Sequence, residues 1–250
     1  IENFLNLGKI VGHNGGNIGR FGGTWTNVVD LSETDNKTQS VREDFTPEDI
    51  VNGKLAYVMG FKQLIGTDEY PSPLNAEEVN YVGEAGYATM YDKANDWALN
   101  GDATAYIAAF DGEKYLQLTE VKDVPAGAAV ILKGSYYNKL ATTATSDVIA
   151  NELRGTDAEI EADGTMYVLA QPEGEEVGFY QATGTIAAGK AYYQSTSGVK
   201  AFYFEGGDAT GISDVNVDLN EDNAIYNIAG QRLQKMQKGI NIVNGKKVLF

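Results

Sequence analysis

The chain has 250 residues, a formal net charge of −16 and no cysteine. The acidic balance argues against nucleic acid and anionic membranes as partners, because both bind basic surfaces. The absence of thiols excludes a disulfide framework, a cysteine nucleophile and thiolate metal sites, and no apolar run reaches the roughly 18 residues of a membrane span.

Residues 1–85 are predicted to form the end of a β-solenoid and its cap. The stretch "LNLGKIVGHNGGNIGRFGGTW" places short apolar pairs between glycines and asparagines, which is typical of stacked β-turn coils. A Gly-rich loop is the alternative. A single coil cannot bury both of its faces, so a preceding coil is expected, and we interpret the chain as the C-terminal part of a longer protein.

A short helix is predicted at residues 46–59. Thr46 suits the N-cap, Pro47 suits the first helical position, and the two acids that follow favour the positive end of the helix dipole. Asn52 and Gly53 weaken the middle of this helix and can split it. We therefore interpret the acids of the first turn as capping groups and not as a catalytic pair.

Residues 86–206 are predicted to form a duplicated antiparallel β-meander, closed as a sandwich or a barrel-like domain. "KYLQLTEVKDVPAGAAVILKG" and "EEVGFYQATGTIAAGKAYYQS" align at a shift of about 62 residues, with Tyr106 opposite Val168 and Ala129 opposite Ala191. A fixed period indicates a repeated unit. The two copies are expected at about 86–147 and 148–206.

Aromatic residues supply the candidate ligand contacts, which are Trp97, Tyr136 and Tyr192. Trp97 follows the turn-like "KAND", which is compatible with partial exposure, but packing in the core is the favoured interpretation. The doublets Tyr136-Tyr137 and Tyr192-Tyr193 place one ring on each face of a strand. One ring of each doublet is therefore expected to be exposed and available to a partner.

Residues 207–223 are predicted to be an exposed acidic linker. Alternating Asp and Asn side chains begin at Asp214, but Leu219 and Ile225 occupy the positions where an EF-hand loop needs glycine and a carboxylate. Residues 224–250 are expected to form a small β module with strands in "AIYNI", "GINIV" and "KKVLF". This last segment is basic, which distinguishes it from the rest of the chain.

The last segment resembles the C-terminal sorting segment of proteins exported by Bacteroidetes through the type IX machinery. The matching positions include Tyr226, Gly230, Arg232, Gly239, Gly245 and Lys246. "GYATMYDKANDW" and "VPAGAAVILKG" resemble β-rich modules of large Bacteroidetes surface proteins. The first third resembles the closing part of surface proteins with Gly-rich GLUG-type repeats.

These resemblances imply a secreted or cell-surface, adhesin-like protein without established catalytic residues, delivered by a secretion machinery and contacting a glycan or a surface protein of a host or bacterium. His13 is the single histidine, and nothing near it supports a catalytic triad or a zinc site. No catalytic residue, cofactor or metal ligand is therefore assigned. The alternatives are a carbohydrate-binding accessory region of a polysaccharide-degrading enzyme and a hydrolase with paired carboxylates.

Overall fold

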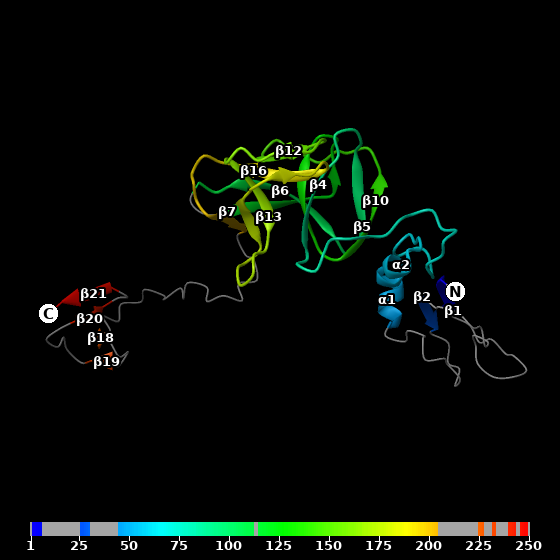
Figure 1. The fold of residues 1–250 in the computed structure, drawn as a ribbon, viewed down its shortest axis with the longest axis horizontal. Helices are drawn as coiled ribbons and strands as arrows, with labels where there is room; N and C mark the ends of the chain where they lie inside the picture. Colours follow the sequence, from blue (N-terminus) through cyan, green and yellow to red (C-terminus); the bar gives the residue numbers. More distant parts are fainter. Residues whose placement is uncertain are drawn as a thin grey trace, which may run out of the picture. The chain divides into compact units, whose positions relative to one another are not determined.

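A computed structural model describes residues 2–6, 26–30, 45–112, 115–204, 225–227, 232–233, 240–243 and 246–249 (Figure 1). Over these residues the protein is mainly β, with short strands and two short helices, as predicted. The chain divides into two compact units, Ile1–Asp208 and Ala209–Phe250. Among the helices of the described segments, none has the length and apolar character needed to cross a membrane.

The predicted helix at residues 46–59 is present as two short helices, α1 (Pro47–Val51) and α2 (Lys54–Met59). The Asp49 backbone N–H donates to the Thr46 hydroxyl at 3.2 Å, and the Thr46 N–H donates to the Asp49 carboxylate at 2.8 Å. This reciprocal pair is a capping box. Gly53 separates the helices at φ 91°, a backbone conformation that glycine adopts without strain.

Apolar side chains of this helical region form their own small core. Phe45, Leu55 and Met59 are buried, and Leu5 packs against them from β1 (Glu2–Asn6). Strand β1 pairs in parallel with β2 (Thr26–Asp30). Residues 7–25, which include His13 and most of the Gly-rich stretch, lie outside the described residues.

The larger unit contains a nine-stranded sheet. Its strands, in chain order, are β4 (Tyr87–Tyr91), β6 (Thr104–Phe110), β7 (Tyr115–Val121), β9 (Ala129–Lys133), β11 (Leu153–Thr156), β13 (Met166–Ala170), β14 (Gly178–Gln181), β16 (Lys190–Gln194) and β17 (Ala201–Phe204). The spatial order is β11-β16-β13-β14-β17-β7-β6-β9-β4. Strand β17 pairs in parallel with β7, whereas the other neighbours pair in antiparallel fashion.

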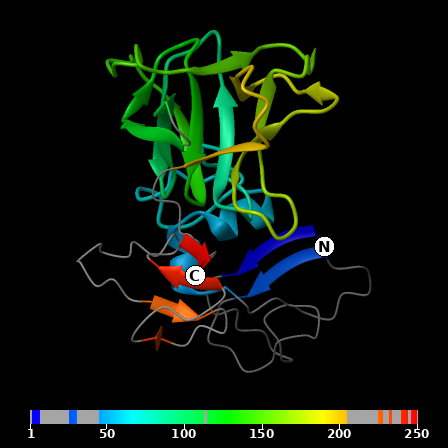
Figure 2. The same cartoon turned by 90° about the vertical axis from the view of Figure 1, so that its left-hand side faces the viewer.

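The two edges of this sheet approach each other, so that it forms a nearly closed, barrel-like structure (Figure 2). The Tyr91 N–H at the end of β4 donates to the Gly189 carbonyl at 2.9 Å. The Gly189 N–H in turn donates to the carbonyl of Thr156, at the end of β11, at 2.7 Å. Gly189 thus links both edge strands, which leaves fewer backbone groups without partners than an open sheet would.

The interior of the barrel is filled mainly by aromatic side chains. Phe202 lies edge-on to Tyr167, Tyr193 and Phe110, with ring centroids 4.9, 4.8 and 5.4 Å apart. These rings belong to a buried cluster to which Leu116, Ile131 and Phe179 also contribute. Strand β17 is the middle strand of the sheet order, and it therefore places its aromatic side chains where the two halves of the sheet join.

A second, smaller sheet covers one side of β4, β6 and β9. It has the order β3-β10-β5-β8, with β3 (Asn80–Tyr81), β10 (Tyr136–Ala141), β5 (Trp97–Gly101) and β8 (Asp123–Val124). Trp97, Tyr137 and Val124 pack between this sheet and the barrel strands, together with Val130 and Leu132. On the other half of the barrel, only a short ladder of β12 (Ile160–Glu161) and β15 (Thr185–Ile186) occupies a comparable position in the chain.

A buried asparagine fastens the segment that follows α2 to the smaller sheet. The Asn138 amide donates to the carbonyls of Gln63 and Glu78 at 2.8 and 2.9 Å. Its side-chain oxygen accepts from the Ile65 N–H at 2.9 Å. Because Asn138 is fully buried, these bonds satisfy backbone groups that water cannot reach.

The C-terminal unit contains one antiparallel sheet of four short strands within its described residues. Their order is β19-β18-β20-β21, with β18 (Ile225–Asn227), β19 (Arg232–Leu233), β20 (Ile240–Val243) and β21 (Lys246–Leu249). Three of them agree with the predicted strands, and β19 is an addition. Tyr226 lies opposite Arg232 and Ile242, and Lys246 lies opposite Val243, whereas Gly230, Gly239 and Gly245 lie outside the described residues.

Candidate functional site

The structure places Trp97 in the core, with 1% of its surface exposed. Core packing, the favoured interpretation for this ring, is therefore confirmed, and Trp97 is not available as a ligand contact. The turn "DKAND" ends before β5, and the first residue of that strand, opposite Val124 of β8, already points between the two sheets. The Lys139 ammonium lies 5.3 Å from the centre of the indole ring, so a sugar has no open face of Trp97 on which to stack.

The two tyrosine doublets differ from each other. In β10, Tyr137 is buried and Tyr136 is half-buried, so the two rings differ as expected but Tyr136 is less exposed than predicted. In β16, Tyr192 and Tyr193 are 9% and 7% exposed, so the predicted exposure of Tyr192 is wrong. Tyr193 faces the barrel interior, while Tyr192 packs against Ile186 and Ala182 on the opposite face. The ladder of β12 and β15 covers the face that the alternation rule leaves to solvent.

Tyr136 belongs to a cluster of three tyrosines from three different elements, here called the tyrosine cluster: Tyr57 of α2, Tyr81 of β3 and Tyr136 of β10. The rings of Tyr81 and Tyr136 are stacked, with centroids 4.8 Å apart and planes inclined by 22°. Tyr57 lies 5.6 and 5.8 Å from these two rings and is tilted by 52° to each. Tyr57 is 47% exposed, which makes it the most open ring of the three.

An ion pair lies beside the tyrosine cluster. The Lys54 ammonium is 2.9 Å from the Asp49 carboxylate. Burial raises the pKa of the Tyr136 hydroxyl, the neighbouring Tyr81 adds to this shift, and the positive charge of Lys54 opposes it. The Tyr136 phenol therefore keeps its proton near pH 7, and its hydroxyl is able both to donate and to accept a hydrogen bond.

Sequence reasoning found only Tyr136 of this cluster. Tyr81 can be recognised as its partner only from the antiparallel register of β10 and β3, in which the two residues lie directly opposite each other. Tyr57 is displayed by a helix that the chain brings to the edge of this sheet. No local pattern in the sequence connects a helical tyrosine with a strand tyrosine. The cluster therefore could not be predicted from the sequence.

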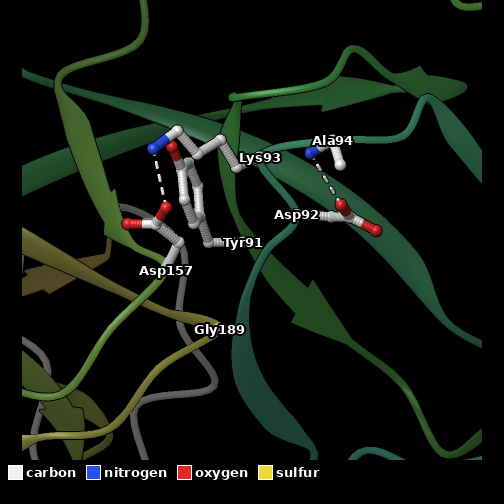
Figure 3. Close-up of a pocket in the computed structure, with 6 residues that line it drawn as sticks. All are labelled: Tyr91, Asp92, Lys93, Ala94, Asp157 and Gly189. Atoms are coloured by element: carbon white, nitrogen blue, oxygen red, sulfur yellow. Dashed lines mark hydrogen bonds and ion pairs between the residues drawn. The ribbon is translucent and has the colours of Figure 1, made fainter.

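An open depression of about 590 Å³ lies where the two edges of the barrel meet (Figure 3). It is lined by Tyr91, Asp92, Lys93, Ala94, Asp157 and Gly189. The Lys93 ammonium and the Asp157 carboxylate are 2.7 Å apart, and both side chains are largely exposed. This pair connects the turn after β4 with the chain after β11. An exposed ion pair of this kind contributes little to stability.

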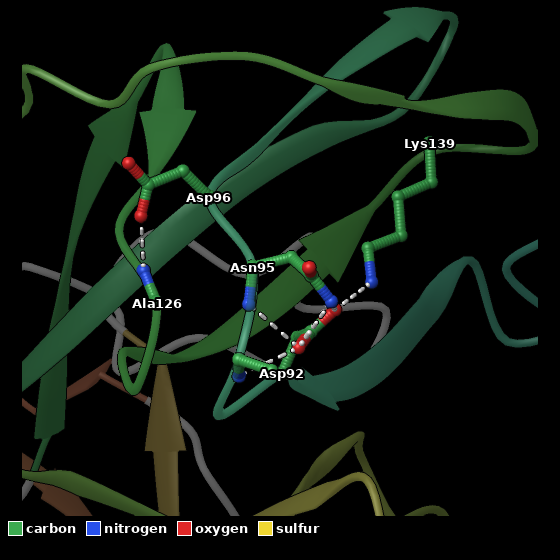
Figure 4. Close-up of polar contacts among 6 residues, drawn as sticks. Asp92, Asn95, Asp96, Ala126 and Lys139 are labelled. Atoms are coloured by element: carbon green, nitrogen blue, oxygen red, sulfur yellow. Dashed lines mark hydrogen bonds and ion pairs between the residues drawn. The ribbon is translucent and has the colours of Figure 1, made fainter.

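The neighbouring carboxylate, Asp92, organises the turn that leads into β5 (Figure 4). It accepts from the backbone N–H groups of Ala94 and Asn95 at 3.0 and 3.1 Å, and from the Lys139 ammonium at 2.6 Å. Asp96 likewise accepts from the Ala126 and Ala144 N–H groups at 2.8 and 3.0 Å. Both carboxylates thus hold loops in place through hydrogen bonds to backbone donors.

The carboxylates of Asp92 and Asp157 do not suit the role of general acid in a glycoside hydrolase. The hydrogen bond from Lys139 lowers the pKa of Asp92, and burial only partly opposes it. The hydrogen bond from Lys93 lowers the pKa of Asp157 in the same way. A general acid must keep its proton near neutral pH, which requires a raised pKa. Within the described residues, no group of three His, Cys, Asp or Glu side chains is arranged to hold a metal ion.

Compared with models of protein families, with curated proteins and with solved structures, the chain shows no significant match.

Proposed function

We propose that the chain is a non-enzymatic, secreted or cell-surface, adhesin-like protein of a Bacteroidetes bacterium. In this proposal the barrel is a scaffold for contacts, and the C-terminal unit is a sorting module. The observation that supports a scaffold most directly is the filled barrel interior. Tyr167, Phe179 and Phe202 are at most 2% exposed, so the place where many barrels hold a ligand is occupied by side chains.

Strand pairing supports a duplicated unit. Strand β6 pairs with β7 and β9, and β13 pairs with β14 and β16. The outer strands follow the same scheme, since β4 pairs with β9 and β11 pairs with β16. The short ladders of β5 with β8 and of β12 with β15 occupy matching places in the chain. Two sequences that pair their strands in the same order are consistent with one repeated fold.

The registers also refine the alignment of the two copies. Tyr106 lies opposite Ile131, and Tyr167 lies opposite Tyr193. If Ile131 and Tyr193 are equivalent, as the sequence alignment has them, Tyr106 corresponds to Tyr167 and not to Val168. The repeat then contains a one-residue shift between its first and third strands, which a constant shift of 62 residues does not include.

The N-terminal segments support the end of a β-solenoid. Strands β1 and β2 pair in parallel, which is the pairing that stacked coils use. The helical region buries Phe45, Leu55 and Met59 against Leu5 of β1. A repeat array needs such a cap, because its last coil otherwise exposes an apolar face.

The sorting proposal rests on the residues of the C-terminal unit. The resemblance assigns importance to Tyr226, Arg232 and Lys246, and all three lie in paired strands. The unit is compact by itself, with its boundary after Asp208. A separately folded unit can be recognised by a secretion machinery through its own strands.

Deleting residues 224–250 tests the proposal in the native host. We expect the shortened protein to remain inside the cell envelope, while its barrel unfolds at an unchanged temperature. The matched control replaces residues 209–223 with a Gly/Ser segment of equal length, and this variant should still reach the surface. Normal export of the shortened protein would contradict the sorting role, and a melting temperature lower by tens of degrees would make the C-terminal unit part of the barrel's core.

A carbohydrate-binding accessory region remains the second candidate function. Trp97 no longer supports it, because that ring is buried. The tyrosine cluster favours it instead, since it presents aromatic surface together with hydroxyl groups. An aromatic ring with one apolar face and one polar end suits contacts that are partly hydrated.

A further inference from the structure

We infer that the tyrosine cluster is a binding site for a neutral sugar ring of a glycan, with Tyr57 as the ring on which the sugar stacks. This inference deepens the proposed role as a contact protein and rests on it. It names the surface that makes the contact and the chemical class of the ligand.

The cluster is held rigidly from three sides. Tyr81 and Tyr136 are directly opposite each other in the register of β3 and β10. Tyr57 projects from α2, whose neighbouring residues Leu55, Ala56 and Met59 are fully buried. A ring whose position is fixed before binding loses little conformational freedom when a ligand arrives, which favours affinity.

Tyr57 combines support on one side with exposure on the other. It contacts the rings of both Tyr81 and Tyr136, yet 47% of its surface remains exposed. Burying aromatic surface contributes favourable free energy in proportion to the area removed from water. A pyranose presents a comparable apolar C–H surface, and such a flat ligand fits a supported aromatic ring.

The hydroxyl groups of the cluster supply polar contacts. Within the part of the chain that the structure describes, no hydrogen bond joins the hydroxyls of Tyr57, Tyr81 or Tyr136 to another protein group. By contrast, the buried Tyr167 and Tyr180 hydroxyls donate to the carbonyls of Val199 and Glu176. Phenols that stay open to hydrogen bonding at a surface match the many hydroxyls of a sugar.

The charge of the protein selects a neutral sugar over an acidic one. The chain has a net charge of −16, which repels uronic acids and sulfated glycans. Lys54 is the cation whose charge acts on Tyr136, and Asp49 pairs with it at 2.9 Å. The local field at the cluster is therefore nearly balanced and offers no strong attraction to an anion.

Affinity gel electrophoresis tests the site with the full chain. The probes are soluble neutral glucan, mannan, xylan and galactan, with polygalacturonate and chondroitin sulfate as acidic counterparts. We expect at least one neutral polysaccharide to retard the protein, and Tyr57→Ala to weaken that binding by about tenfold, the change expected for losing one stacked ring. Tyr57→Trp should retain the binding, because it keeps an aromatic face.

Tyr70→Ala is the matched control. Tyr70 is 45% exposed, close to the value for Tyr57, but it lies in a loop outside the cluster. Retardation by none of the neutral polysaccharides, equal binding by wild type and Tyr57→Ala, or preferential binding of the acidic probes would each overturn the inference. Failure here with normal surface delivery leaves the proposed function intact, whereas binding by a protein that is never delivered would contradict the proposed function alone.

Discussion

The two halves of the nine-stranded sheet use the same pairing scheme and fill it with different side chains. The first half comprises β4, β6, β7 and β9, and the second comprises β11, β13, β14 and β16. Inside the barrel, the first half contributes small or aliphatic residues such as Ala108, Ala129 and Ile131, and the second contributes Tyr167, Phe179 and Tyr193. Large side chains of one half thus meet small ones of the other, which favours interdigitated packing.

On the outer face of the barrel, the first half has the more extensive covering and the larger buried side chains. The first half is covered by a four-stranded sheet with Trp97 and Tyr137 between the layers. The second half is covered by the two-residue ladder of β12 and β15, with a small cluster around Ile186 and Tyr192. A common hydrogen-bonding scheme is thus compatible with different packing in each half. Only the first half gained a surface that fastens the helical region.

The largest expected effect comes from the outer core of the first half. Trp97→Ala should lower the free energy of unfolding by about 3–5 kcal/mol, because a fully buried indole leaves a large cavity. Ile160, which begins the corresponding ladder, is only half-buried, so Ile160→Ala should cost about 1 kcal/mol. Urea titrations followed by far-UV circular dichroism measure both values. Equal losses in the two variants would contradict the difference in packing between the halves.

The next largest effect concerns the attachment of the segment after α2, which the first half makes through Asn138. Asn138→Ala leaves the Ile65 N–H and the carbonyls of Gln63 and Glu78 without their partner. We expect a loss of about 2–4 kcal/mol, because buried backbone groups become unsatisfied. Trypsin should then cut after Lys62 far more rapidly than in the wild type.

Asn151→Ala is the control for this attachment. Asn151 donates to the Ala129 carbonyl and accepts from the Ala108 N–H, so it joins the second half to the first. This variant should lose stability without faster cleavage after Lys62. If Asn138→Ala leaves the rate of cleavage unchanged, the segment after α2 is held by other contacts.

The smallest expected effect is a dependence of folding stability on pH through Asp92. Lys139 holds the pKa of Asp92 below its ordinary value, so the folded state binds a proton less readily than the unfolded state. Stability from this group is complete above about pH 4, the ordinary range of an aspartate, and is lost as the pH falls below it. Asp92→Asn should cost about 1–2 kcal/mol at pH 6, and the difference from wild type should shrink towards pH 2.

Thermal unfolding between pH 2 and pH 7 measures this dependence. Glu173→Gln, at an exposed position, serves as the control and should follow the wild-type curve. A constant difference between Asp92→Asn and wild type across this range would show that the carboxylate acts through shape and not through charge.

Local features of the sequence predicted much of the fold. Thr46 caps the helix as predicted, with Asp49 completing a capping box, and Gly53 splits the helix that it was expected to weaken. Along β7, the alternation of "YLQLTEV" directs Leu116 and Leu118 towards one buried cluster. These predictions succeed because hydrogen bonds between near neighbours and side-chain periodicity do not depend on distant residues.

The candidate site depended on contacts that no local pattern contains. The expected exposure of Tyr192 was wrong, and Trp97 is closed to a ligand, because each strand has a second layer of β structure over the face in question. Tyr57 was missed because its neighbours in the cluster lie in strands far along the chain. Burial of an aromatic side chain is decided by which element covers it, and alternation along a single strand does not contain that information.

The sequence by itself determined the mainly β character, the short hairpins, the capped helix and the basic strands of the last segment, since these follow from periodicity, turn residues and charge. The tertiary structure alone decided that the sheet closes through Gly189, that β17 pairs in parallel with β7, and that three tyrosines meet at one surface. The physical reason is that these features satisfy backbone groups and bury rings from elements distant in the chain. Their free energy exists only when the whole domain has assembled.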